Sequence, residues 1–184
     1  MSDLFSGLIT SKTRIRLLLR FFLNAETSAY LRELSNEFNV SSNSVREELN
    51  QLTKTNLLTS QKSGRQIFYK ANPEHPLFPE LRSMVRKVMG VDQVIDGILI
   101  RLGELKSAYL IDDYAEGKDT GIIDLLLVGD INHNQLNDLS GKVEKYINRK
   151  IRTLVMSQPE FFDFGPKLKL RPNLLIWKQD GADH

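Results

Sequence analysis

The sequence contains no cysteine, a single tryptophan and only three histidines. Without cysteine, a disulfide framework, a thiolate metal site and a cysteine nucleophile are all excluded. The apolar runs are short, because Arg20 and Asp124 interrupt the two longest, and neither approaches the roughly 20 apolar residues of a membrane span. The first eleven residues lack the basic stretch of a secretory signal. We therefore expect a cytoplasmic protein without a membrane partner.

Length and charge suggest two parts with different partners. The 184 residues suffice for one large domain or two small ones, and 41% hydrophobic with 26% charged residues is an ordinary globular composition. Residues 1–90 hold 13 Lys and Arg against 8 Asp and Glu, a net charge of +5, whereas residues 91–184 hold 12 against 15, a net charge of −3. The first half is therefore the candidate for binding a polyanion.

Three amphipathic helices are predicted in the first half from the spacing of apolar residues and from their capping residues. Ser11 is a candidate N-cap for the first helix. A second helix is predicted from about Ser28 to Asn39, a residue that tolerates the left-handed conformation of a helix end. Ser41 or Ser42 caps a third helix, so the last two form a helix-turn-helix pattern.

A hairpin with a basic tip follows these helices. Gly64 can adopt positive φ in a turn, and the residues on both sides of it favour strands. The segment YLRELSNEFNVSSNSVREELNQLTKTNLL, followed by SGRQIFYKAN, resembles the winged helix-turn-helix regulators of the ArsR/MarR-like kind. The resemblance covers roughly residues 8–75 and implies a DNA-binding domain over residues 1–76.

The resemblance implies which residues meet DNA, since the start of the second helix of a helix-turn-helix enters the major groove. Those base-reading positions hold Ser42, Asn43, Ser44, Arg46, Glu47 and Asn50. The hairpin tip would contact phosphate or the minor groove through Lys62, Ser63, Gly64 and Arg65, with Lys12 and Arg14 placed for phosphate. Glu47 either accepts from a cytosine amino group or pairs with Arg46 or Gln51. The alternative is that all of these residues are solvated surface on a domain that binds only protein.

The second half reads as a small α/β domain over residues 92–184, so the fold class of the whole chain is α+β. Pro73 and Pro76 break the structure before it, and apolar spacing predicts a connecting helix within residues 77–91 that either dimerises or packs on its own domain. The elements predicted after it are a helix over 92–104, a strand over 107–111, a polar loop over 112–121, a strand over 122–129, a helix over 134–150 and strands over 151–156 and 173–178.

Residues 92–160 resemble the minimal nucleotidyltransferase domain of polymerase-beta-like enzymes. The segments YAEGK and IIDLLLVGD keep the family frame, with Tyr114, Ala115, Gly117 and Asp124 matching. In that family a Gly-Ser pair ends the first strand, Asp-x-Asp opens the second, and a later strand adds a third aspartate. The three aspartates hold the metal ions that carry the nucleoside triphosphate.

The catalytic positions of this chain depart from that pattern. Asp112 and Asp113 replace Gly-Ser, Ile122 replaces the first aspartate, and the strand around Thr153 has no carboxylate. Asp124 alone cannot hold two divalent ions. A carboxylate 4 Å from a phosphate charge also costs about 4 kcal/mol at an effective dielectric near 20. We therefore expect no catalytic residue, no metal and no cofactor at this degenerate site, which comprises Asp112, Asp113, Gly117, Ile122 and Asp124. The alternative is a rearranged metal site on its three aspartates.

These observations predict a transcriptional regulator that binds double-stranded DNA as a homodimer, because one recognition helix reads only a few base pairs. The second domain would then serve dimerisation, docking of a protein partner or sensing of a small-molecule effector. The alternative functions are an active metal-dependent nucleotidyltransferase joined to a winged helix, and a protein–protein adaptor. The three histidines have no metal or catalytic spacing, and Trp177 is predicted to lie in the core or an interface.

Overall fold

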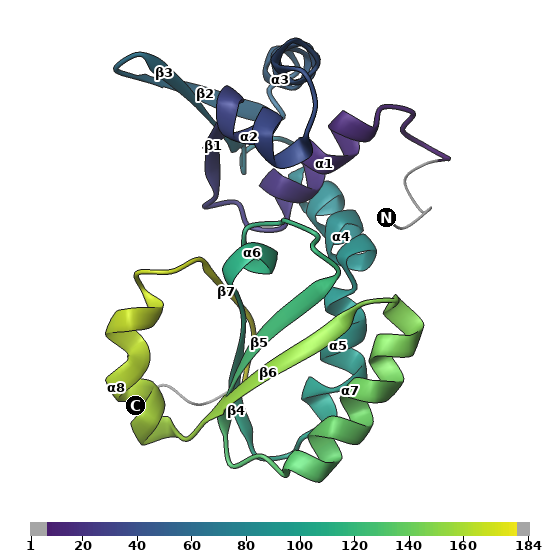
Figure 1. The fold of residues 1–184 in the computed structure, drawn as a ribbon, viewed down its shortest axis with the longest axis vertical. Coiled ribbons are helices and arrows are strands. Elements are labelled where there is room, and N and C mark those ends of the chain that lie inside the picture. The colour runs from purple at the N-terminus through teal and green to yellow at the C-terminus, as the bar shows by residue number, and fades with distance from the viewer. Residues whose placement is uncertain (1–6, 180–184) are drawn as a thin grey trace. The chain divides into compact units, whose positions relative to one another are not determined.

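The computed structural model describes residues 7–179, which form eight α-helices and two β-sheets of a mixed α+β fold. The chain divides into two compact units, one up to Val88 and the other from Met89 onward. The first unit holds the elements α1 (Lys12–Phe22), β1 (Ser28–Tyr30), α2 (Leu31–Phe38), α3 (Ser42–Lys54), β2 (Leu58–Ser63), β3 (Gln66–Ala71) and α4 (Phe78–Met89), the last of which ends at the boundary (Figure 1).

The capping residues predicted for the first unit are confirmed. The Ser11 hydroxyl accepts a hydrogen bond from the Arg14 amide at 3.2 Å, and Ser41 caps α3 in the same way. Asn39 ends α2 in the left-handed conformation with φ of 51°. Gly64 has φ of 59° at the hairpin turn. Each of these residues satisfies or redirects backbone groups that a helix end or a tight turn would leave unpaired.

The start of the second helix was predicted wrongly. Residues Ser28–Tyr30 form the strand β1, and α2 begins only at Leu31. β1 pairs antiparallel with β3, which also pairs with β2, so the three-stranded sheet has the order β1-β3-β2. Ala29 at the centre of β1 is buried, and the rings of Tyr30 and Phe68 meet edge to face at 5.8 Å. This pairing with a strand far along the chain overrides the local helical pattern.

A buried arginine joins α1 to α2. The Arg20 side chain is 1% exposed, and its guanidinium donates to Glu33 and Glu37 of α2 at 3.2 Å each. Apolar residues of the three helices and of α4 are buried in the same unit and form its core, which includes Leu17, Phe21, Phe22, Leu34, Val45, Leu49 and Val85. An arginine in such surroundings is stable only while its charge is neutralised.

The second unit is built on a four-stranded sheet. Its elements are α5 (Val91–Gly97), a short 3-10 helix η1 (Leu99–Arg101), β4 (Leu105–Ile111), α6 (Asp112–Ala115), β5 (Ile122–Gly129), α7 (His133–Ile147), β6 (Lys150–Met156), α8 (Gln158–Leu168) and β7 (Asn173–Lys178). The strand order is β6-β5-β4-β7, with β5 and β6 parallel and the other neighbours antiparallel. Helices α5 and α7 lie on one side of the sheet and α8 on the other (Figure 1).

Three elements of the second unit differ from the prediction. The helix expected over residues 92–104 stops at Gly97 and resumes only as η1. α5 packs closely on α7 at this point, where a Cβ at Gly97 would lie 2.4 Å from the Val143 side chain. The predicted polar loop over 112–121 begins with the short helix α6. Helix α8 was not predicted, although Ser157 and Glu160 form a capping box at its start.

No helix within residues 7–179 combines the length and the apolar character needed to cross a bilayer.

Replacing Arg20 with methionine should weaken the attachment of α2 to α1. Breaking a fully buried pair costs about 3–5 kcal/mol, and the partial exposure of both glutamates lowers the expected loss to about 2–4 kcal/mol. Amide hydrogen exchange of α1 and α2 measures this loss as a lower free energy of local opening. The matched control is Arg32→Met on the exposed surface of α2. Equal protection in the two variants would show that Arg20 does not hold the helices together.

Candidate nucleic-acid interface

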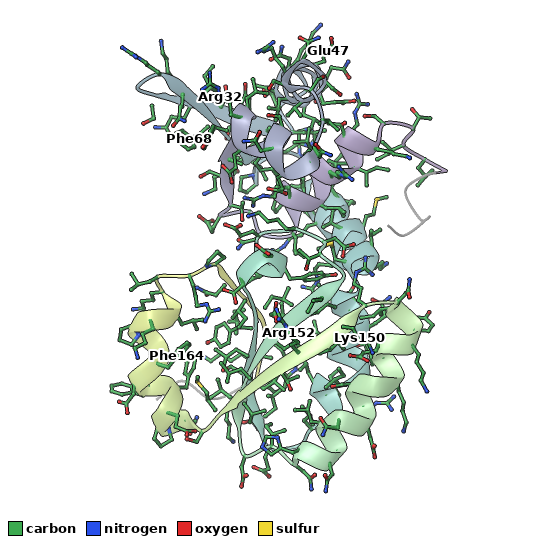
Figure 2. The ribbon with its side chains drawn as sticks, in the orientation of Figure 1. Arg32, Glu47, Phe68, Lys150, Arg152 and Phe164 are labelled. Carbon is green, nitrogen blue, oxygen red and sulfur yellow. The ribbon has the colours of Figure 1, made fainter. Side chains whose placement is uncertain are left out.

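Helix α3 has one buried and one exposed face. Val45, Leu49 and Leu52 point into the core of the first unit, whereas a row of exposed side chains follows the opposite face at offsets of 0, 4, 7 and 11 residues, namely Asn43, Glu47, Asn50 and Lys54. Arg46 is exposed beside this row. Figure 2 shows Glu47 on the side of α3 that faces away from the other elements of the unit. We call Asn43, Arg46, Glu47, Asn50 and Lys54 the outer face of α3.

The serines at the start of α3 have mainly structural contacts. The Ser42 hydroxyl donates to the Ser35 hydroxyl of α2 at 3.2 Å, which ties the two helices together. Ser44 is half-buried, and its amide donates to the capping hydroxyl of Ser41. Ser42 remains exposed, so its hydroxyl stays accessible to a ligand, whereas Ser44 is less accessible than the other predicted base-reading residues.

Three side chains of the outer face of α3 form a chain of hydrogen bonds. Arg46 donates to the Asn43 side-chain oxygen at 3.3 Å, and the Asn43 amide donates to Glu47 at 3.1 Å. Of the two alternatives for Glu47, the structure does not show the pairing with Arg46 or Gln51, since its hydrogen-bond partner is Asn43, which also accepts from Arg46. Gln51 instead accepts a hydrogen bond from Arg14. The arrangement follows from the three- and four-residue spacings, which bring side chains together along a helix.

Arg14 and Lys12, both predicted to contact phosphate, differ in their surroundings. The Arg14 guanidinium donates to Glu48 of α3 at 2.7 Å and to Gln51, so its charge is largely used to hold α1 against α3. Lys12 is exposed at the start of α1. Sequence reasoning could not separate the two, because the partners of Arg14 lie 34 and 37 residues away.

The tip of the β2–β3 hairpin is fully accessible. Lys62, Ser63, Gly64 and Arg65 are all exposed, and pairing of Ser63 with Gln66 leaves Gly64 and Arg65 as the turn. The hairpin projects beyond the helices of its unit (Figure 1). Nothing within Lys62–Arg65 is buried against the unit, so these residues are available to a ligand rather than needed for packing.

The three aspartates of the degenerate site each lie beside a basic residue. Asp112, at the end of β4, accepts hydrogen bonds from both Nε and Nη2 of Arg171. Asp124 on β5 accepts at 2.6 and 2.8 Å from Arg152 on the neighbouring strand β6, which Figure 2 labels on that strand. Asp113 lies 3.8 Å from the Lys118 ammonium. These arginines were missed by sequence reasoning, since nothing in their spacing relates them to the aspartates.

The remaining residues of the degenerate site lie near these pairs. Ile122 is half-buried at the start of β5, and Gly117 has φ of 81° in the loop after α6. Asp112 has φ of 58°, a left-handed conformation that glycine adopts most easily, at the position where the resemblance expects the glycine of Gly-Ser. Within residues 7–179 no three His, Asp or Glu side chains gather in a way that could hold a metal ion. The three aspartates point to three different cations instead of to one centre.

Two polar contacts, one of them buried, join the loop and helix before β5 to other parts of the second unit. Arg149 donates to both carboxylate oxygens of Asp119 at 3.1 and 2.7 Å, and the Tyr114 hydroxyl donates to the Met89 carbonyl. Burial raises the pKa of Tyr114 far above its ordinary range, so this hydroxyl stays protonated. Burial also disfavours the charge on Asp119, but hydrogen bonds and charge from Arg149 outweigh it and hold the pKa of Asp119 below its usual value.

Comparison with known proteins gives no family. No family model matches the chain, and no curated protein does. Among solved structures, reduced HlyU from Vibrio cholerae is 17% identical, with a TM-score of 0.37 over 47% of this chain and 83% of its own. A protein of Sulfolobus solfataricus, provisionally titled a nucleotidyltransferase, is 19% identical, with a TM-score of 0.36 over 55% of this chain and 88% of its own.

The structure of a mutant of the toxin–antitoxin pair MntA-HpeT is 13% identical, with a TM-score of 0.38 over 49% of this chain and 73% of that chain. Each of the three likenesses spans only about half of this chain. At TM-scores below 0.5 they do not establish a shared fold, and the function has to be argued from the residues themselves.

The ion pair of Asp119 should give the second unit a stability that depends on pH. Because the folded pKa of Asp119 is lowered, its contribution is complete above the unfolded value of about 3.9 and is lost as pH falls through the folded value. Asp119→Asn should therefore be less stable than the wild type at pH 7, and the difference should shrink below about pH 4. Thermal unfolding followed by fluorescence of Trp177, the only tryptophan, measures the difference in the second unit. A difference that stays constant between pH 7 and pH 3 would contradict this assignment.

Proposed function

We propose that the chain is a transcriptional regulator that binds duplex DNA through its first unit and does not catalyse nucleotidyl transfer with its second. In this proposal the first unit is a winged helix-turn-helix domain, with α2 and α3 as the helix-turn-helix and the β2–β3 hairpin as the wing. The second unit is a nucleotidyltransferase-like domain that serves dimerisation, docking of a protein partner or sensing of a small-molecule effector.

The observation that carries the DNA-binding proposal is that the polar residues of the first unit form two groups, one that holds the helices together and one that faces solvent. Arg14, Arg20 and Glu48 are used to hold the helices together. The outer face of α3 and the hairpin tip are exposed and make no contact that the fold needs. A helix whose polar face is free, beside a projecting hairpin with a lysine and an arginine, matches the geometry in which a helix enters the major groove and a hairpin reaches the backbone.

The charge distribution supports the same choice of ligand. The net charge of +5 lies in residues 1–90, and the hairpin tip adds two cations to a segment of four residues. Phosphate contacts of this kind supply affinity for any duplex, while side chains on the helix supply sequence preference. One helix covers only a few base pairs, so a dimer on two half-sites is the expected binding form.

The absence of catalysis is proposed from the electrostatics of the second unit. Asp112 and Asp124 would have to turn toward a common metal ion, but each is held by two hydrogen bonds from an arginine. Paired hydrogen bonds between arginine and carboxylate are among the stronger polar contacts of proteins. Exposure of Arg152 to 68% reduces what its pair contributes to stability, yet the pair still occupies both oxygens of Asp124.

Replacing Lys62 and Arg65 with alanine should weaken binding to duplex DNA of any sequence. Each phosphate contact that is lost should reduce the slope of log K against log[salt] by about 0.9. The measurement is a titration of a generic duplex at several salt concentrations. The matched control is the double variant Lys142→Ala, Lys145→Ala, which removes the same charge from exposed positions of α7. An unchanged slope for the hairpin variant, or no salt-dependent binding by the wild type, would favour the adaptor function instead.

The nucleotidyltransferase alternative predicts binding of a nucleoside triphosphate that requires magnesium. We expect calorimetry with ATP, GTP, CTP and UTP in the presence of magnesium to give no heat of binding. If one of them binds, Asp124→Ala decides between the alternatives, with the exposed Asp130→Ala, directly after β5, as the control. Loss of magnesium-dependent binding in Asp124→Ala alone would establish the second unit as a nucleotide site.

A further inference from the structure

A negative charge lies at the centre of the surface that the proposed function places against DNA. Glu47 belongs to the exposed row of α3, with Asn43 one turn before it and Asn50 one turn after it. A carboxylate there is repelled by phosphates and loses hydration when the helix enters a groove. Such a residue weakens binding to DNA in general, unless a particular base offers it a hydrogen bond.

The hydrogen bond that Glu47 makes within α3 leaves one of its carboxylate oxygens able to accept from a base. The Asn43 amide occupies the oxygen Oε1 of Glu47 at 3.1 Å. Within residues 7–179 no side chain or backbone group donates to the other oxygen, Oε2, which lies on an exposed face and can only accept a hydrogen bond. Asn43 uses its own oxygen for Arg46 at 3.3 Å, so both of its polar atoms are directed at neighbours on the helix and not outward.

Most N–H groups of the Arg46 guanidinium remain available to donate to a base. Only Nη1 of Arg46 is directed at Asn43, and the guanidinium carries five N–H groups in a planar fork. That fork matches the two acceptors N7 and O6 of guanine. Glu47, with one free acceptor, matches the amino group of cytosine. Adenine also has an amino group, but its N7 acceptor lies beside it and repels a carboxylate.

We propose that the outer face of α3 selects G·C-containing sites, with Glu47 reading a cytosine and Arg46 reading a guanine within reach of the same turn. Asn43 is a positioning residue that holds the two charged side chains apart and fixes their directions, and it does not itself read a base. This inference rests on the proposed function, which it extends from DNA binding to a preferred base composition. The same carboxylate that accepts from cytosine is repelled by guanine or thymine at that position, since each of these bases presents only acceptors in the major groove.

Selection from a duplex pool with a randomised central segment tests this inference, using the intact chain. The wild type should enrich sites that contain a cytosine and a guanine at fixed positions. Glu47→Gln keeps the size of the side chain but replaces an acceptor with an amide, which matches adenine. We expect the cytosine preference at one position to change to adenine while the guanine preference remains.

Affinity measurements give the expected size of this change. Glu47→Gln should reduce the discrimination for cytosine over the other bases by about 10-fold or more, and it should raise the affinity for unrelated duplexes because a negative charge is removed. The matched control is Glu74→Gln, an exposed glutamate of the same unit outside α3. The control should raise affinity less and should leave the selected sequence unchanged.

Two further variants separate reading from positioning. Arg46→Lys keeps the charge but loses the planar fork, so the guanine preference should fall while the salt dependence of binding is retained. Asn43→Ala should loosen the cytosine and guanine preferences together without changing the salt dependence or the melting of the protein. A purely structural role for Asn43 would instead lower stability and leave both preferences in place.

The outcomes distinguish this inference from the function on which it rests. If the wild type binds no duplex in a salt-dependent way, the proposed function and the inference both fail. If the wild type binds DNA but its selected sites lack the cytosine, or Glu47→Gln selects the same sites as the wild type, DNA binding stands and the assignment of Glu47 is wrong.

Discussion

The placement of α3 depends on a charge that is buried one helix away from it. Arg20 has almost no access to solvent, so its guanidinium must be neutralised inside the protein, and Glu33 and Glu37 of α2 provide the opposite charge. This requirement fixes α2 against α1. Ser35 of α2 then contacts Ser42 at the start of α3. Together with the hydrogen bonds from Arg14 of α1 to Glu48 and Gln51 of α3, these contacts orient the outer face of α3.

Local signals in the sequence were sufficient for the elements whose ends are set by their own residues. Ser11, Asn39 and Gly64 act through neighbouring backbone groups, and their roles were predicted correctly. Two elements that depend on distant contacts, β1 and α8, were not predicted. β1 has three residues and exists because β3 pairs with it. α8 contains Pro166 inside the helix, where proline removes a backbone hydrogen bond and so argues locally against a helix, and it packs its aromatic residues on the sheet, with Phe161 stacked on Tyr109 of β4.

The exposure of the candidate residues could be predicted from the sequence, but their ion-pair partners could not. Exposure of the hairpin tip and of the outer face of α3 follows from turn chemistry and helical spacing. The pairing of Asp124 with Arg152 and of Asp112 with Arg171 joins residues 28 and 59 positions apart, which only the sheet and the end of α8 bring together. The sequence therefore identified the altered acidic positions, but it could not show that an arginine side chain lies beside Asp112 and Asp124.

The strand β6 forms one rim of the four-stranded sheet, and its composition has a consequence for self-association. An unpaired strand is a template on which a strand of another molecule can add. Lys150 and Arg152 place two cations on this rim, and the Ile151 amide is already donated to Glu144. Charges on an edge strand oppose such addition. The cations that neutralise Glu144 and Asp124 therefore also protect the protein from aggregating through its open β-edge.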